Sequence, residues 1–296
     1  MTHRLGSWTP PDDADTALAL RGVHAGYPGT PGVLDCVSVT IGAGRRTAIL
    51  GANGSGKTTL LRVLSGAHAP AEGSVVSGGE VLRHTRRGLT AHRQRVQLVM
   101  QDPDDQLFSA DVRSDIGYGP TNLGLGAAET AGRVDEALAV LSLEELADRP
   151  VHRLSFGQRK RVAVAGALAM HPQVLLLDEP TAGLDPAGVE EMLAAVAALE
   201  AHGTTVVLST HDVDLAWRWA DEVALVVDHV VHQGEVTDAL TDVDLVEAAR
   251  LRPPWSVQLL RELGIEPAAV GWPRTPGEVA VAVASAHLPQ DSRVTR

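Results

Sequence analysis

The chain has 296 residues, a formal net charge of −12 and an apolar fraction of 44%, which suits one large domain or a main domain with an appendage. The negative charge disfavours nonspecific binding to nucleic acid or to an anionic membrane. The single cysteine excludes an internal disulfide and fits a reducing compartment. No segment approaches the ~20 apolar residues of a membrane span, and the N-terminus lacks the apolar stretch of a secretory signal. We therefore predict a cytoplasmic protein without a nucleic-acid partner, which reaches a membrane only by docking onto other chains.

The first part of the chain combines strand patterns with one glycine-rich loop. Residues 1–16 are polar and are expected to form a flexible lead-in. Apolar alternation and short apolar runs predict strands at residues 18–24, 33–41, 46–50 and 95–100. Cys36 lies in the second of these and is expected to be a small buried residue. The turn-rich segment GAHAPAEGSVVSGGE predicts a small β arm.

A basic segment precedes the strand at 95–100. It contains Arg86, Arg87, Arg93 and Arg95. These arginines do not form a stripe of the kind that reads DNA, and we interpret them as a solvated face.

The second part alternates helix and strand patterns. Helical spacing of apolar residues predicts helices within 111–146 and at 158–170, 187–201 and 213–220. Apolar runs predict strands at 174–177, 205–209 and 223–227, the last followed by a hairpin at 228–229. Such alternation indicates a doubly wound α/β sheet. Beyond about residue 240 the sequence carries no readable chemistry, apart from an amphipathic helix pattern after Pro253-Pro254 and a weak apolar run after Gly271.

The segment GANGSGKTT matches the phosphate-loop pattern G-x-x-x-x-G-K-[ST] between a predicted strand and a predicted helix. The glycines let backbone N–H groups surround a phosphate, and the helix N-terminus adds partial positive charge. The alternative is a glycine-rich turn with a surface lysine. The chain has only two lysines, and one stands at the required position, which favours the phosphate loop. The predicted nucleotide-binding residues of this loop are Gly51, Asn53, Gly54, Ser55, Gly56, Lys57, Thr58 and Thr59.

Two acidic residues end the apolar strand at 174–177. Asp178 is placed to hold Mg²⁺ together with Thr58, and Glu179 to activate an attacking water as general base. The alternative is a strand that simply ends in two solvated acids. His211 follows another apolar strand, and Gln101 ends a third; both are expected at the same sheet edge, where ligands of open α/β sheets bind. We predict catalytic roles for Glu179, His211 and Gln101, and a contact of Gln101 with Mg²⁺ or the water.

The order of five motifs along the chain resembles that of ATP-binding cassette (ABC) ATPases. These motifs are the phosphate loop, Gln101, LSFGQRKRVAVAGAL (154–168), LLLDEPTAGLD (175–185) and His211. The resemblance covers about residues 18–240. It implies a P-loop NTPase fold of the ABC type over residues 17–240, with a small antiparallel β arm and a helical insertion at about 102–160. Residues 241–296 would then be a C-terminal appendage and tail.

The resemblance also implies a homodimer that sandwiches ATP and Mg²⁺ between two subunits. Ser155, Gly157 and Gln158 would approach the γ-phosphate bound by the partner subunit, and Tyr27 would stack on adenine. Asp185 would couple the two sites. Phe156 departs from the family, which usually has glycine there. We expect the backbone at Phe156 to suit an ordinary residue and activity to survive.

A closer resemblance, carried by QDPDDQLFSADVRSDIGYGP (101–120) and by LSFGQ followed by RKRV, is to energy-coupling factor ATPases, above all the CbiO type of cobalt and nickel importers. It implies an ATPase at the cytoplasmic face of the membrane, working with CbiQ-like and CbiM-like membrane subunits. The alternatives are a vitamin importer of the same group or another ABC transporter, and, from a different class, a soluble ABC protein acting on ribosomes or DNA. A P-loop small-molecule kinase would have no use for the 154–168 segment.

Overall fold

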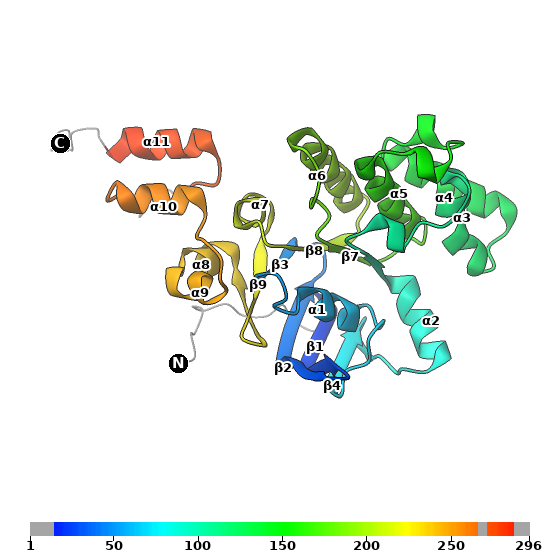
Figure 1. Ribbon diagram of the computed structural model, residues 1–296, viewed down its shortest axis with the longest axis horizontal. Coiled ribbons are helices and arrows are strands. Elements are labelled where there is room, and N and C mark those ends of the chain that lie inside the picture. Colours follow the sequence, from blue (N-terminus) through cyan, green and yellow to red (C-terminus); the bar gives the residue numbers. More distant parts are fainter. Residues whose placement is uncertain (1–14, 266–270, 287–296) are drawn as a thin grey trace, which may run out of the picture.

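A computed structural model describes residues 15–265 and 271–286 (Figure 1). The predicted lead-in therefore lies outside the described residues up to position 14. Within the described part, the strands form two sheets. The larger sheet has the order β10-β9-β3-β8-β7-β6, parallel except for the β9–β10 hairpin. Its strands are β3 (Thr47–Leu50), β6 (Val96–Val99), β7 (Val174–Asp178), β8 (Thr205–Thr210), β9 (Glu222–Val227) and β10 (Val230–Glu235).

The smaller sheet is antiparallel, with the order β2-β1-β4-β5. Its strands are β1 (Thr16–Tyr27), β2 (Thr30–Gly42), β4 (Glu72–Ser77) and β5 (Glu80–Val81). Cys36 is exposed and has a φ of 51°, so the expectation of a buried cysteine is wrong. The pairing of β1 with β2 shifts register between Val23 and Ala25, opposite Val37 and Leu34. The extra residue on β2 disrupts the alternation that a sequence pattern assumes.

Seven helices lie between β3 and β9. They are α1 (Lys57–Leu64), α2 (Arg86–Arg95), α3 (Val112–Asn122), α4 (Ala127–Val140), α5 (Phe156–Leu168), α6 (Pro186–Ala201) and α7 (Val213–Trp219), with short 3₁₀ turns at 103–105, 144–146 and 151–153. Helices α1, α2, α5, α6 and α7 contact strands of the large sheet, whereas α3 and α4 pack mainly on α5 and on each other. Helices α3, α4 and α5 gather on one side of the molecule (Figure 1). Helix α2 begins where Thr85 accepts a hydrogen bond from Gly88 N. The polar composition of α2 and its glycine hid it from the sequence analysis.

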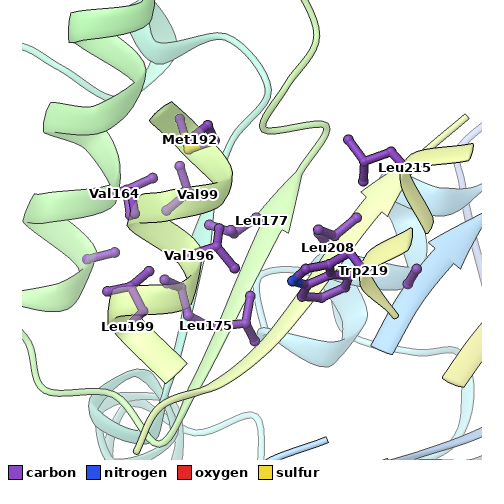
Figure 2. Packing of buried hydrophobic residues seen from close by; sticks show 14 of the residues in the cluster. Val99, Val164, Leu175, Leu177, Met192, Val196, Leu199, Leu208, Leu215 and Trp219 are labelled. Atoms are coloured by element: carbon purple, nitrogen blue, oxygen red, sulfur yellow. The ribbon is translucent and has the colours of Figure 1, made fainter. Parts of the chain in front are cut away.

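Alternate residues of each central strand point to opposite cores, because successive side chains of a strand face opposite sides. Leu175 and Leu177 belong to one cluster, whereas Leu176 belongs to the other. In Figure 2, Leu175 and Leu177 lie against the helix that carries Met192 and Val196. The opposite cluster is closed by α1 and by the antiparallel sheet. A strand buried on both faces reads as the unbroken apolar run of a parallel sheet.

The C-terminal part continues this packing. Helices α8 (Val236–Thr241), α9 (Val243–Ala248) and α10 (Trp255–Glu262) follow β10, and the weak apolar run after Gly271 forms helix α11 (Pro276–Ala286). The predicted boundary between the main domain and the appendage, at residues 240–241, lies inside α8, and Leu245 and Val257 belong to the larger core cluster.

The segment before α11 is attached to the main domain by buried polar contacts. Trp217 Nε1 donates to the Pro273 carbonyl over 3.1 Å, and the Ser256 hydroxyl donates to the same oxygen over 2.8 Å. Arg274 stacks over the Trp217 ring at 5.6 Å. No helix within the described ranges has the length and apolar character that crossing a membrane requires.

Candidate nucleotide-binding site

The loop between β3 and α1 has the geometry of a phosphate cradle. Gly56 has a φ of 111°, a conformation that favours glycine, and it precedes the first residue of α1. A Cβ at Gly51 would lie 2.5 Å from Ser55 Oγ, so a side chain there would fill the loop. Ser55 Oγ is itself buried and has no hydrogen-bond partner among the described residues. An unsatisfied buried hydroxyl facing this loop fits a phosphate oxygen as its missing acceptor.

Lys57 is the first residue of α1 and is only 5% exposed. Its ammonium donates to the carbonyls of Gly51 over 2.9 Å and Ala52 over 3.2 Å. It also lies 3.3 Å from Glu179 Oε1. The loop backbone and one carboxylate therefore hold the cation at the mouth of the cradle, where it can bind a phosphate group.

Asp178 ends β7 beside the phosphate loop. Its two carboxylate oxygens accept hydrogen bonds from Thr58 Oγ1 at 2.8 Å and from Ser209 Oγ at 2.6 Å. Ser209 is paired with Asp178 across β7 and β8, and its hydroxyl also accepts from Glu179 N at 3.0 Å. Ser209 was not predicted as a site residue, although a hydroxyl residue at the end of an otherwise apolar strand is a usable signal.

Glu179 is held in an unusual position. Its φ is 44°, in the left-handed region that costs a non-glycine residue about 1–3 kcal/mol. One carboxylate oxygen faces Lys57, and the other lies 3.0 Å from His211 Nδ1. The structure therefore brings together the two acids, Lys57 and His211, which are far apart in the sequence.

Lys160 fixes the backbone of Glu179, although it was not predicted as a site residue. From the second turn of α5 its ammonium donates to the carbonyls of Glu179 at 2.9 Å and Pro180 at 3.1 Å. Burial lowers the pKa of Lys160 to about 8, against the attraction of Glu179, Asp102 and Asp178. Both lysines of the chain thus contact Glu179.

Replacing Lys160 with methionine is expected to remove a pH-dependent part of the free energy of unfolding. The pKa of Lys160 falls from 10.5 to about 8 on folding, so between these pH values the unfolded chain binds more protons and stability rises with pH. Below about pH 8 the burial of the charged ammonium opposes folding in full. As the pH rises above about 8, this unfavourable contribution to the free energy of folding decreases by at most about 3 kcal/mol.

Denaturant unfolding of the wild type and of Lys160→Met at neutral pH and near pH 10 measures this effect. The wild type should gain stability relative to the variant as the pH rises. A difference that stays constant across the range would contradict the lowered pKa.

Helix α5 begins at the predicted 154–168 segment. Ser155 caps the helix by accepting from Gln158 N at 3.2 Å, and Gln158 Oε1 accepts from Ser155 N at 2.9 Å. Phe156 is the first residue of α5 and has helical backbone geometry, which confirms that this position suits an ordinary residue. Its ring packs on Gly183, where an added Cβ would lie 3.1 Å from it. Gly157 follows in the first turn.

Gln101 and Phe156 line one pocket of about 420 Å³ together with Thr58 and Asp178. Gln101 is exposed at its edge. The tip of the phosphate loop, Asn53 and Gly54, instead faces a smaller pocket of about 150 Å³ on its other side.

Tyr27 lies beside α1. Its hydroxyl is 3.5 Å from Thr59 Oγ1 and 3.4 Å from Arg62 Nη1, and its ring packs against His68 with centroids 4.7 Å apart. Burial raises its pKa, but the hydrogen bonds and the charge of Arg62 outweigh this, so that the pKa of Tyr27 is lower than usual. The structure therefore places Tyr27 next to the last residue of the predicted phosphate loop.

A divalent cation would find few ligands from the protein alone. No group of three or more His, Cys, Asp or Glu suited to a metal occurs in the described part of the chain. Thr58 Oγ1 and Asp178 Oδ2 lie side by side. Oxygen ligands of this kind suit Mg²⁺, which is usually bound by one or two protein groups plus phosphates and water.

Comparison with known proteins decides the family. The ABC transporter family model matches residues 34–182. The chain belongs to this family. A protein of Streptomyces coelicolor named as an ABC transporter ATP-binding protein is 52% identical over 92% of this chain and 96% of its own length. The cobalt import ATP-binding protein CbiO of Rhodobacter capsulatus is 50% identical over 82% of this chain and 87% of its own.

Solved structures of ABC ATPases resemble this fold. CbiO1 of Clostridium perfringens, described as part of the transporter complex CbiONQ, has a TM-score of 0.72 and 37% identity, covering 83% of this chain and 99% of its own. A dimeric ATP-binding cassette with ADP and phosphate bound has a TM-score of 0.66 and 27% identity, covering 74% and 98%. The predicted ABC-type fold is therefore confirmed, and the chain is an ABC ATPase that binds ATP and couples its hydrolysis to transport.

Proposed function

We propose that this ABC ATPase powers uptake of cobalt or nickel ions as the ATP-hydrolysing subunit of an energy-coupling factor importer. The observation that carries the proposed catalytic step is the position of Glu179, whose carboxylate lies between Lys57 and His211 and beside the Thr58–Asp178 pair. The likeness to a cobalt import protein over most of the chain supports the cargo.

In this proposal Lys57 binds the terminal phosphates and Glu179 takes a proton from the attacking water. His211 would orient the Glu179 carboxylate through its 3.0 Å contact. Thr58 and Asp178 would hold Mg²⁺, with Gln101 at the edge of the same pocket. Bound Mg²⁺ would neutralise charge on the phosphates during transfer.

The second half of each site would come from a second copy of the chain. Ser155, Gly157 and Gln158 stand at the start of α5, where helix N–H groups and the helix dipole favour an anion. We propose that they contact the nucleotide of the partner, and that Tyr27 packs on its adenine. A dimeric relative supports this assembly. One chain carries both halves, so a homodimer suffices.

A surface suited to a membrane partner lies between α2, α3 and α5. It surrounds a pocket of about 400 Å³ lined by Phe108 and Tyr118 among others. These rings are 65% and 50% exposed and pack edge to face with centroids 4.6 Å apart. Exposed aromatic pairs mark protein interaction sites. We propose that CbiQ-like and CbiM-like membrane subunits dock here and hold the ATPase at the cytoplasmic face of the membrane.

Uptake of radioactive cobalt and nickel by cells expressing the chain with its genomic neighbours tests the proposal. Wild type should support uptake of one or both metals. Phe108→Ser should lose uptake but keep ATP hydrolysis in the purified protein, because Phe108 is exposed and outside the phosphate loop. Failure of both metals, with a vitamin taken up instead, would assign the chain to the vitamin importers.

A soluble role on ribosomes or DNA is the rival from another class. Copurification separates the two: membrane subunits should accompany the tagged chain, and ribosomal proteins should not. Recovery with ribosomes alone would overturn the transport proposal.

A further inference from the structure

A pocket of about 720 Å³ lies between the β4–β5 arm and α2, away from the phosphate loop. Its charged lining consists of Arg83, Arg87, Arg95 and Glu80, and Val81 adds an apolar wall. Val81 is 60% exposed, so this wall faces solvent. None of the groups assigned to the nucleotide site lines this pocket.

The pocket is basic in a protein of strongly negative charge. Residues 81–101 contain five arginines and no acid, whereas the whole chain has a formal net charge of −12. Three of the five arginines, Arg83, Arg87 and Arg95, line the pocket, and within the described ranges none of them has an ion-pair partner. With Glu80 as the single acid of the lining, the arginines leave an uncompensated positive charge. Arg86, Arg87 and Arg93 are exposed, as expected for a solvated face, but Arg87 and Arg95 also line this pocket.

A buried hydroxyl is a second, independent sign that this pocket binds a ligand. Ser77 is 5% exposed and lines the pocket, yet its Oγ has no hydrogen-bond partner among the described residues. Buried polar atoms without partners are rare and call for an explanation. His92 lines the same pocket, and burial lowers its pKa. The hydrogen bond with the Leu64 carbonyl raises this pKa, whereas the charges of His84, Arg95 and Arg93 lower it. The Nε2 atom of His92 lies 2.8 Å from the Leu64 carbonyl oxygen.

We propose that this pocket binds a phosphate ester. Guanidinium groups bind phosphate through paired hydrogen bonds, and the Ser77 hydroxyl supplies a further donor. The volume is that of a site for a ligand of drug size, far larger than a bare phosphate ion. The apolar wall at Val81 fits the organic part of the ester. Its source is either the headgroup of an anionic phospholipid or a soluble phosphate ester, and both present the same chemistry to the arginines.

The experiment uses the full-length chain with its nucleotide site filled by a nonhydrolysable ATP analogue and Mg²⁺, so that the phosphate loop is occupied. Cosedimentation with phosphatidylglycerol vesicles is compared with cosedimentation with phosphatidylcholine vesicles. In a parallel arm, glycerol 3-phosphate is added and the unfolding temperature is measured.

Arg87→Ala and Arg86→Ala are a matched pair of neighbours on α2. Both side chains are exposed, but only Arg87 lines the pocket. Arg87→Ala should weaken binding by about five- to tenfold, the effect of removing one cationic contact to a phosphate or an anionic surface. Arg86→Ala should stay within about twofold of wild type. Ser77→Ala should weaken binding without lowering the unfolding temperature, because the hydroxyl has no protein partner to lose.

Retention on phosphatidylglycerol vesicles that Arg87→Ala reduces and Arg86→Ala does not would assign the site to lipid headgroups. A rise in unfolding temperature with glycerol 3-phosphate, absent in Arg87→Ala, would assign it to soluble esters. Equal effects of Arg86→Ala and Arg87→Ala would show attraction by overall charge and overturn the site. Absence of binding in both arms would overturn it as well.

Discussion

Glu179→Gln should retain ATP binding and lose hydrolysis by about 10²–10⁴-fold, the range for a positioned general base. The amide keeps the shape of the side chain and its contact with His211, but it cannot accept the proton of the attacking water. It also removes the ion pair with Lys57, which lies 3.3 Å away. No carboxylate then competes with the nucleotide phosphates for Lys57, so ATP affinity should hold or rise.

Phosphate release and equilibrium binding of a fluorescent ATP analogue measure the two effects separately. Glu190→Gln is the control, since Glu190 is an exposed acid on α6 whose partner is Arg218. It should leave both quantities unchanged. Wild-type turnover in Glu179→Gln would remove Glu179 from the proposed mechanism.

Lys57→Ala should weaken ATP binding by about ten- to a hundredfold, the loss of a charge-assisted hydrogen bond to phosphate. The ammonium is 5% exposed and is held by two loop carbonyls, so its position is set before ATP binds. The substitution also leaves Glu179 without its cation, which should lower hydrolysis beyond the loss of affinity.

The double variant Lys57→Ala/Glu179→Gln separates these two causes. If Lys57 acts on ATP directly, the loss of affinity persists in the Glu179→Gln background. Arg252→Ala, at an exposed arginine, controls for the loss of one positive charge. Normal ATP affinity in Lys57→Ala would contradict the phosphate-loop assignment.

The sequence allowed prediction of those parts of the site whose positions depend on local pattern. The phosphate loop follows an apolar strand and starts a helix, so its location could be inferred from GANGSGKTT alone. Asp178, Glu179 and His211 follow strand ends, and parallel strands of one sheet share a ligand-binding edge. Their mutual contacts follow from that topology.

The parts that escaped prediction depend on contacts between distant segments. Ser209 matters because β7 pairs with β8 in the register that faces it to Asp178. Lys160 resembles any lysine of a helix until the fold buries it against two carbonyls. Cys36 follows an alternating pattern, but an extra residue in β2 turns it outward. Each case is an override of local pattern by tertiary pairing.

The pocket formed by the basic segment at residues 81–101 could not be predicted from the sequence either. Arg86, Arg87, Arg93 and Arg95 were interpreted as a solvated face because arginines are mostly exposed. Only the packing of α2 against the β4–β5 arm converts some of them into the lining of a pocket. Charge patterns in a sequence give the sign of a surface, whereas its concavity depends on the fold.

Helix α5 connects Ser155 to the backbone of Glu179 through Lys160. Ser155 caps this helix, and just over one helical turn later Lys160 donates hydrogen bonds to the carbonyl groups of Glu179 and Pro180. A helix resists compression and bending through its own hydrogen bonds, so a push on its first turn moves the whole rod. Any contact that shifts Ser155 is therefore transmitted to the backbone of Glu179. The two ends of the proposed ATP sandwich are thus mechanically connected within a single subunit.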